Sequence, residues 1–159
     1  LVLDEISAEV DERFDDDALW LIGPGTTTRA FMEYKGLDNT LLGVDVVQCG
    51  KVVLSDATAK QLEVLLADWQ GPVQVLVTAI GGQGHVFGRG NQQFSPAVLR
   101  KVGKAAVTVV MTKTKLAGLN HRPLIIDSND AELDADWSGF IEIVTGYHDQ
   151  VIYPISNGL

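Results

Sequence analysis

The stretch IGGQGHVFGRGNQQ, residues 80–93, decides how this chain is organised. It follows an apolar run, VQVLVTA (73–79), which has the length and composition of a buried strand. Beyond it, Ser95 and Pro96 supply a capping hydroxyl and a proline at the first helical position, which together predict a helix start. A buried strand, a glycine-rich loop and a helix in this order are typical of an α/β domain.

Strands and helices also alternate on either side of this loop. Further strands are predicted at 18–22, 40–48, 51–55, 104–112, 122–127, 138–147 and 150–155, and further helices at 26–36, 57–69 and 113–119. The last two strands flank a short turn, HDQ, so they should pair in antiparallel fashion. The sequence therefore predicts an α/β fold, a layered mixed sheet with helices and with antiparallel strands at the C-terminal end. The order of the strands in the sheet does not follow from these patterns.

Composition restricts the function classes. The chain has 159 residues and a formal net charge of -9 at pH 7, which argues against non-specific nucleic-acid binding because that needs a basic face. No apolar run approaches the roughly 20 residues of a membrane span, so we expect a cytoplasmic protein that binds no membrane. The lone Cys49 has no cysteine partner for a disulfide or a zinc site, and we expect it to be buried in a strand.

Residues 1–17 carry many acids against a single arginine, Arg13. Such charge runs are usually solvated, so we expect a solvated segment or the tail of a longer element. Because the sequence also begins within a pattern, we interpret residues 1–17 as an acidic lead-in from a missing N-terminal domain. Residues 18–159 then form one domain.

The first candidate ligand site is LIGPGTTTRA, residues 21–30. A strand enters a Gly-Pro-Gly turn and three threonines begin a helix, whose N-terminus presents unpaired backbone N–H groups and the positive end of the helix dipole. Such a helix end suits a phosphate or a dinucleotide. The candidate contacts are Gly25, Thr26, Thr27, Thr28 and Arg29, and a tight capped turn without ligand is the alternative.

The second candidate site is the glycine-rich loop itself. Its glycines allow backbone N–H groups to form a concave nest for anions, and His85 and Arg89 could pair with phosphate. Side-chain amides carry donors and acceptors that suit ribose hydroxyls or an adenine edge. The candidate residues are Gly82, Gly84, His85, Arg89, Asn91 and Gln92, and a structural loop at a subunit interface is the alternative.

These motifs resemble the ATP-NAD kinase family. DDALWLIGPGTTTRAFME is similar to a family segment of the NAD site, and aligning its glycine with Gly25 places the family's aspartate on Asp16. The chain departs from the family where Asp17 replaces a glycine and Arg29 replaces a tyrosine. GPGTTTRAFME, GLDNTLLGVDVV, IGGQGHVFGRGNQQFSP and RPLIID resemble the acetoin-catabolism-type subgroup in its C-terminal region.

The resemblance implies an NAD kinase-like C-terminal domain. The parent reaction would transfer the γ-phosphoryl group of ATP to the 2′-hydroxyl of NAD, with Mg²⁺, in a protein that forms a homo-oligomer. GGQG (81–84) resembles the family's Gly-Gly-Asp-Gly motif, but Gln83 lacks the negative charge of a base or a firm magnesium ligand. We therefore assign no catalytic residue and no metal ligand to this chain, and expect it to be inactive without the missing N-terminal half.

Two other functions remain open. GPGTTT also resembles the phosphate loops of ribose-5-phosphate isomerase-like domains, with Asp45, Asp56 and Lys51 as possible catalysts. The other open function is that of a non-catalytic oligomerisation module built on the glycine-rich loop. Asp45 is a candidate site residue in either enzyme, because an acid within a buried strand needs a partner or a function. The acidic segment 127–136 lacks the pattern of a calcium loop and should be a solvated connection.

Overall fold

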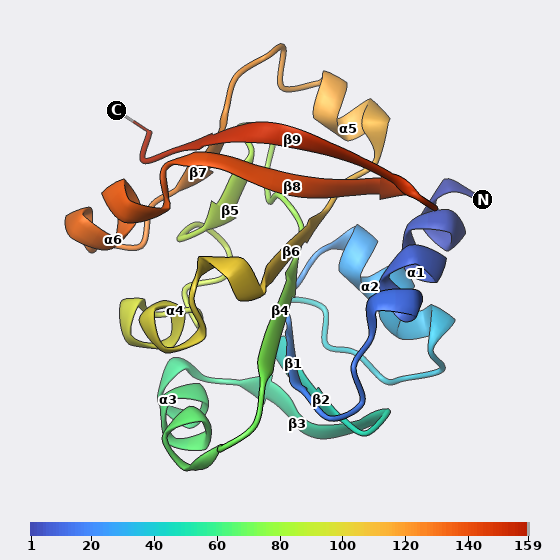
Figure 1. The fold of residues 1–159 in the computed structure, drawn as a ribbon, viewed down its shortest axis with the longest axis vertical. Coiled ribbons are helices and arrows are strands. Elements are labelled where there is room, and N and C mark those ends of the chain that lie inside the picture. Colours follow the sequence, from blue (N-terminus) through green and yellow to red (C-terminus); the bar gives the residue numbers. More distant parts are fainter. Residues whose placement is uncertain (159) are drawn as a thin grey trace.

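The computed structural model describes residues 1–158 and contains one nine-stranded mixed sheet with helices on both faces (Figure 1). The strand order is β3-β2-β1-β4-β6-β8-β9-β7-β5. The strands are β1 (Leu19–Ile22), β2 (Val44–Gln48), β3 (Lys51–Ala57), β4 (Val73–Val77), β5 (His85–Phe87), β6 (Val107–Val110), β7 (Leu124–Ile126), β8 (Gly139–Gly146) and β9 (Asp149–Ser156). The helices are α1 (Val2–Arg13), α2 (Thr26–Tyr34), α3 (Ala59–Asp68), α4 (Pro96–Val102), α5 (Lys113–Ala117) and α6 (Ala131–Trp137), with a 3₁₀ turn at Lys104–Ala106.

Strand direction divides the sheet into regions. β1, β4, β6 and β8 run parallel to one another, whereas the hairpins β2–β3 and β8–β9 are antiparallel. β9, β7 and β5 form a second parallel set at the far edge. The predicted fold class, a layered mixed sheet with an antiparallel finish, is therefore confirmed.

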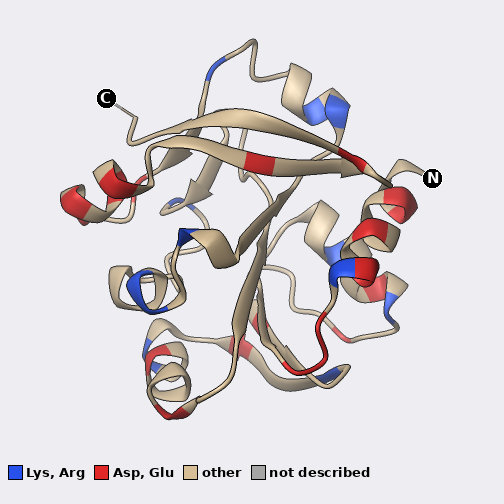
Figure 2. Cartoon of the chain, in the orientation of Figure 1, with Lys and Arg blue, Asp and Glu red and all other residues tan. Residues whose placement is uncertain are grey.

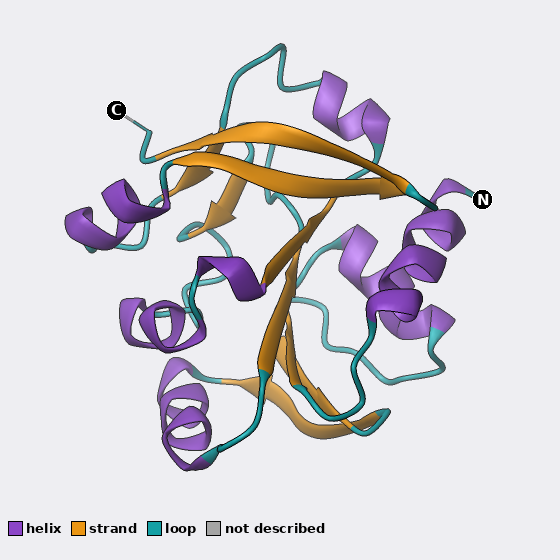
Figure 3. Cartoon of the chain, viewed as in Figure 1, coloured by secondary structure: helices purple, strands orange, loops and turns teal. Residues whose placement is uncertain are grey.

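Alternate side chains of β1 show how the two layers form. Leu19 and Leu21 face a core that also contains residues of α3, α4 and α6, whereas Trp20 and Ile22 face a second core with α1 and α2. β1 and β2 are buried on both faces, which explains why these central strands read as nearly continuous apolar runs. Figure 3 shows α3, α4 and α6 on one side of the central strands and α1 and α2 on the other.

The acidic N-terminal segment differs from the prediction. Residues 2–13 form α1, whose Ile6 and Val10 are each 1% exposed and pack against Phe31 and Val144 in the second core. Only the outer face is solvated, and Figure 2 marks acidic residues along α1 and in the loop that follows it. The prediction of a solvated segment is wrong for the inner face, because an apolar stripe at helical spacing outweighs the charge count.

Three further expectations also fail. The glycine-rich loop is interrupted by β5, a buried strand that bonds to β7, and is therefore partly core. The acidic segment 127–136 contains α6, whose Leu133 and Trp137 are buried, so it is not a purely solvated connection. Cys49 is exposed because it lies in the β2–β3 turn, in a left-handed conformation (φ 51), and not within a strand.

None of the helices in the described chain is long and apolar enough to cross a membrane.

Candidate functional site

The carboxyl ends of β1 and β4 meet at one edge of the sheet because these strands are parallel neighbours. The Gly-Pro-Gly turn follows β1, and the glycine-rich loop follows β4, so the topology brings the two sequence-predicted sites together. Gly25 adopts φ +130, and a Cβ built there would lie 2.3 Å from the Thr78 Cγ2 at the end of β4. Only glycine therefore allows the two turns to approach this closely.

The N-terminus of α2 is shaped by its threonines in different ways. The Thr28 hydroxyl is buried and donates to the Gly23 carbonyl oxygen at 2.7 Å, which closes the turn. Thr27 is 5% exposed and packs inside, whereas Thr26 is exposed beside the turn. The first-turn N–H groups of a helix have no acceptor within the helix, so they are available to an anion at this end. Thr26 is the only one of the three that is exposed.

A cavity of about 510 Å³ lies over this helix end, and we call it the α2 cavity. Arg29 lines it and forms an ion pair with Glu33, with Nε and Oε1 3.0 Å apart. Gly90 of the glycine-rich loop also lines this cavity. The apolar part of the lining comes from side chains of α1, α2 and two loops, namely Leu3, Ala30, Leu41, Leu42 and Ile80.

Two predicted site residues lie elsewhere or have another role. Asp16 precedes β1, whereas Gly25 follows it, so the two residues lie at opposite ends of the strand. Asp45 is 2% exposed and accepts hydrogen bonds from the Thr40 N–H, the Thr40 hydroxyl and the Asp56 N–H, at 2.8, 2.7 and 3.0 Å. Its carboxylate therefore fixes the loop before β2 and the end of β3. Lys51 begins β3 and Asp56 lies near its end, which separates the lysine from the two acids, Asp45 and Asp56, that an isomerase-like site would need beside it.

The glycine-rich loop contains a second pair of structural residues. Asn91 is fully buried, and its amide group accepts from the Gly88 N–H at 3.0 Å and donates to the Val86 carbonyl oxygen at 2.7 Å. Gly84 is buried, and its carbonyl oxygen accepts from the Ile125 N–H at 2.9 Å, while Gly82 is exposed. Asn91 and Gly84 hold the loop in place rather than face a ligand.

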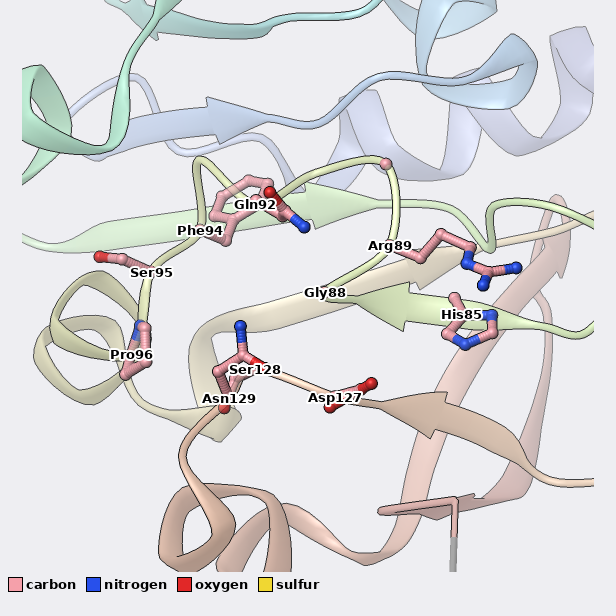
Figure 4. Close-up of a pocket in the computed structure, with 11 residues that line it drawn as sticks. His85, Gly88, Arg89, Gln92, Phe94, Ser95, Pro96, Asp127, Ser128 and Asn129 are labelled. Atoms are coloured by element: carbon pink, nitrogen blue, oxygen red, sulfur yellow. The ribbon is translucent and has the colours of Figure 1, made fainter.

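A second cavity, of about 410 Å³, lies between the loop after β5 and the loop after β7 (Figure 4). We call it the β5–β7 cavity. Its lining contains three predicted residues, His85, Arg89 and Gln92. Sequence reasoning missed the other polar residues of the lining, which are Ser95, Asp127, Ser128 and Asn129. A polar run directly after a predicted strand was the available signal, because ligand sites gather at the carboxyl ends of parallel strands.

His85 forms one wall of the β5–β7 cavity. Its side chain is only 8% exposed, and its Nδ1 atom is buried without a hydrogen-bond partner in the described chain. Burial disfavours the charged imidazolium, and the nearby Arg89 guanidinium adds to this effect, so the pKa of His85 is lowered, although Asp127 opposes the shift. This environment favours the neutral form of the His85 imidazole.

A third group of polar residues lies between α1 and the β8–β9 turn. Glu9, Glu12 and His148 place potential metal-ligand atoms within 4.8 Å of one another. Glu9 already accepts from Arg13 Nε at 2.9 Å and from the His148 N–H at 2.7 Å, and Tyr147 donates to Glu12. These bonds fasten α1 to the β8–β9 turn, and we interpret the group as a structural contact.

The comparisons with known proteins gave one result. A family model described as the ATP-NAD kinase C-terminal domain matches residues 15–155. The comparison with curated proteins and the comparison with solved structures found no significant match.

Proposed function

This chain belongs to the ATP-NAD kinase C-terminal domain family, and from that premise we propose that it forms a nucleotide-binding part of an ATP-dependent NAD kinase-like protein. In the proposed reaction, the γ-phosphoryl group of ATP passes to the 2′-hydroxyl of NAD and gives NADP. Phosphoryl transfer of this kind depends mainly on positioning and on stabilising negative charge. Positioning is the task that we propose for this chain.

The observation that carries the proposal is the α2 cavity. It combines a helix N-terminus, the exposed Thr26 hydroxyl and the Arg29 guanidinium with a glycine at which backbone can approach closely. These groups suit a phosphate, because unpaired N–H groups and a guanidinium both bind negative charge. Leu41 and Leu42 are 69% and 76% exposed beside them and offer apolar surface to a base ring. We propose that one half of a dinucleotide binds here.

The residues of the α2 cavity do not fit a magnesium site of their own. Glu33 is the one carboxylate of the lining, and it is already paired with Arg29. Mg²⁺ is held mostly by waters, substrate phosphates and one or two free carboxylates, so we assign no step of this chain to the metal. We propose that a catalytic carboxylate comes from an N-terminal domain, and that the whole protein is a cytoplasmic homo-oligomer.

Titration calorimetry of the chain with NAD, NADP, ATP and ribose 5-phosphate tests the proposal. We expect NAD or NADP to bind, and Arg29→Gln to weaken that binding about tenfold or more, because one hydrogen bond to a charged group contributes about 1.5–3 kcal/mol. Lys115→Gln is the control, since Lys115 is exposed on α5 and lines neither cavity.

Other outcomes would contradict the proposal in different ways. Binding of ribose 5-phosphate at the α2 cavity, without any dinucleotide, would favour the isomerase-like alternative. Absence of binding for all four compounds would show that this chain alone does not hold the nucleotide. Formation of NADP from NAD and ATP by the pure chain would refute the assignment of catalysis to another domain.

A further inference from the structure

The β5–β7 cavity is separate from the α2 cavity, and Gly90 stands between them in the lining of both. Its walls come mainly from the loops that follow two neighbouring parallel strands, β5 and β7. The Asp127 N–H donates to the Phe87 carbonyl oxygen at 2.9 Å, which continues the strand pairing to the rim of the cavity. The cavity therefore lies where ligands of parallel sheets are usually found.

The two loops that form this cavity are fixed by buried polar side chains behind them. Asn91 holds the first loop through its bonds to the Gly88 N–H and the Val86 carbonyl oxygen. Asp134, 6% exposed, holds the second loop by accepting from the Ser128 hydroxyl at 2.6 Å and from the Ser128 N–H at 3.1 Å. Burying an amide and a carboxylate is costly unless they are fully bonded, and here their bonds fix the cavity walls.

The charges on the walls are unpaired. Arg89 and Asp127 are both exposed, and neither forms an ion pair with any residue of the described range 1–158. Figure 4 shows the Arg89 side chain above His85, and Asp127 on the opposite wall. A cation and an anion that face one cavity without meeting suit a ligand with an anionic group and hydrogen-bond donors. The Nδ1 atom of His85 has no hydrogen-bond partner in the described chain, and it is buried behind the cavity surface, so only the other edge of the ring can reach a ligand.

We propose that the β5–β7 cavity binds a phosphorylated sugar, with Arg89 on the phosphate and Asp127 and Asn129 on the sugar hydroxyls. Guanidinium binds phosphate through parallel N–H bonds, and a carboxylate accepts from two hydroxyls. The neutral imidazole of His85 adds a hydrogen bond without repelling a cation or an anion. A volume of about 410 Å³ accommodates a pentose phosphate, and the edge of Phe94 completes the wall.

The inference does not depend on the proposed NAD site. Free pentose phosphate and the ribose phosphate part of a nucleotide share the same chemistry, so the experiment compares ribose 5-phosphate with AMP. Calorimetry with the chain also includes inorganic phosphate and ribose as partial ligands. Equal affinity for ribose 5-phosphate and AMP would identify the sugar phosphate as the recognised unit, whereas tighter binding of AMP would identify a nucleotide as its source.

Two substitutions separate the phosphate contact from the sugar contact. Arg89→Gln should weaken ribose 5-phosphate and inorganic phosphate alike, by about tenfold or more. Asp127→Asn should weaken ribose 5-phosphate several-fold while inorganic phosphate binds as before or more tightly, because a negative charge has been removed. Lys115→Gln and Asp38→Asn, both at exposed positions away from this cavity, are the charge-matched controls.

Nuclear magnetic resonance of the histidine rings gives a second readout, because the chain has three histidines. The ring signals of His85 should shift on addition of ribose 5-phosphate and saturate with the calorimetric affinity. The proposal is wrong if ribose 5-phosphate binds no more tightly than inorganic phosphate, or if Arg89→Gln leaves its affinity unchanged. Arg29→Gln should not alter the binding of ribose 5-phosphate. The experiment therefore distinguishes an error in the proposed nucleotide site of the α2 cavity from an error in the proposed sugar-phosphate site of the β5–β7 cavity.

Discussion

Gly88→Ala should damage the β5–β7 cavity and the fold around it. Gly88 adopts φ +112, which L residues rarely occupy, and a Cβ built there would lie 1.9 Å from the Asp127 carbonyl oxygen. The obstacle is backbone, so it cannot turn away as a flexible side chain would. Either the loop after β5 or the loop after β7 must therefore move.

The magnitude follows from two contributions. A residue forced into a sparsely populated backbone region costs about 1–3 kcal/mol, and overpacking costs about 1–3 kcal/mol more. A total of about 4 kcal/mol should lower the Tm by about 8–16 °C, at about 2–4 °C per kcal/mol for a chain of this size. Binding of ribose 5-phosphate should also be lost, because the loops after β5 and β7 would no longer be held at the distance that forms the cavity.

Gly82→Ala is the matched control within the same glycine-rich loop. Gly82 is exposed, its φ lies outside the left-handed region, and no heavy atom lies within 4 Å of a Cβ built there. Its free energy of unfolding should change by less than about 1 kcal/mol. Thermal unfolding followed by circular dichroism measures both variants. If Gly88→Ala unfolds within about 2 °C of Gly82→Ala, the reasoning on the close approach at Asp127 is refuted.

Three further predictions concern single polar groups. Burial opposes ionisation of Glu9, but the hydrogen bond from Arg13 and that from a backbone N–H outweigh it, so its pKa is lowered. Glu9→Gln should therefore lower the free energy of unfolding by about 1–3 kcal/mol at pH 7. In denaturant titrations, the difference from the unchanged chain should shrink as the pH falls through the folded pKa of Glu9. A difference that stays constant with pH would contradict the ion-pair assignment. In a proton resonance titration, the pKa of the His85 ring should lie below the ordinary value of about 6.5, because burial and the nearby Arg89 guanidinium disfavour its charged form. A titration midpoint above about 6.5 would contradict this environment. Asp45→Ala should lower the free energy of unfolding by about 1–3 kcal/mol in urea titrations, because three donors lose their acceptor; an unchanged stability would show that the carboxylate is free for another role.

Much of the architecture was predictable because local signals agree with the tertiary structure. The Ser95 hydroxyl accepts from the Val98 N–H at 3.3 Å, and Pro96 begins α4, as the cap pattern indicates. Thr58, directly before α3, caps that helix by accepting from the Gln61 N–H. The antiparallel closing hairpin follows from its short turn. In each of these places the residues that decide the structure are neighbours in the sequence.

The site was less predictable because it depends on contacts between distant segments. Asp127–Asn129 reach the cavity only because β7 lies beside β5, and the strand order could not be derived from periodicity. Asn91 carries the hydrogen-bonding groups of a ligand contact, and only its complete burial reveals that it serves the loop. Ile6 and Val10 were similarly hidden among acids, because a charge count ignores which face of a helix a residue occupies.

The most direct test of the central claim is a nuclear magnetic resonance titration of the isotopically labelled chain with NAD, in which the backbone amide signals are followed. The account predicts that the amides of Thr26, Thr27 and Thr28 shift together and saturate, and that Arg29→Gln weakens the response. NAD binding that leaves these three amides unchanged, or no response to NAD at millimolar concentration, would contradict the assignment of a nucleotide site to the N-terminus of α2.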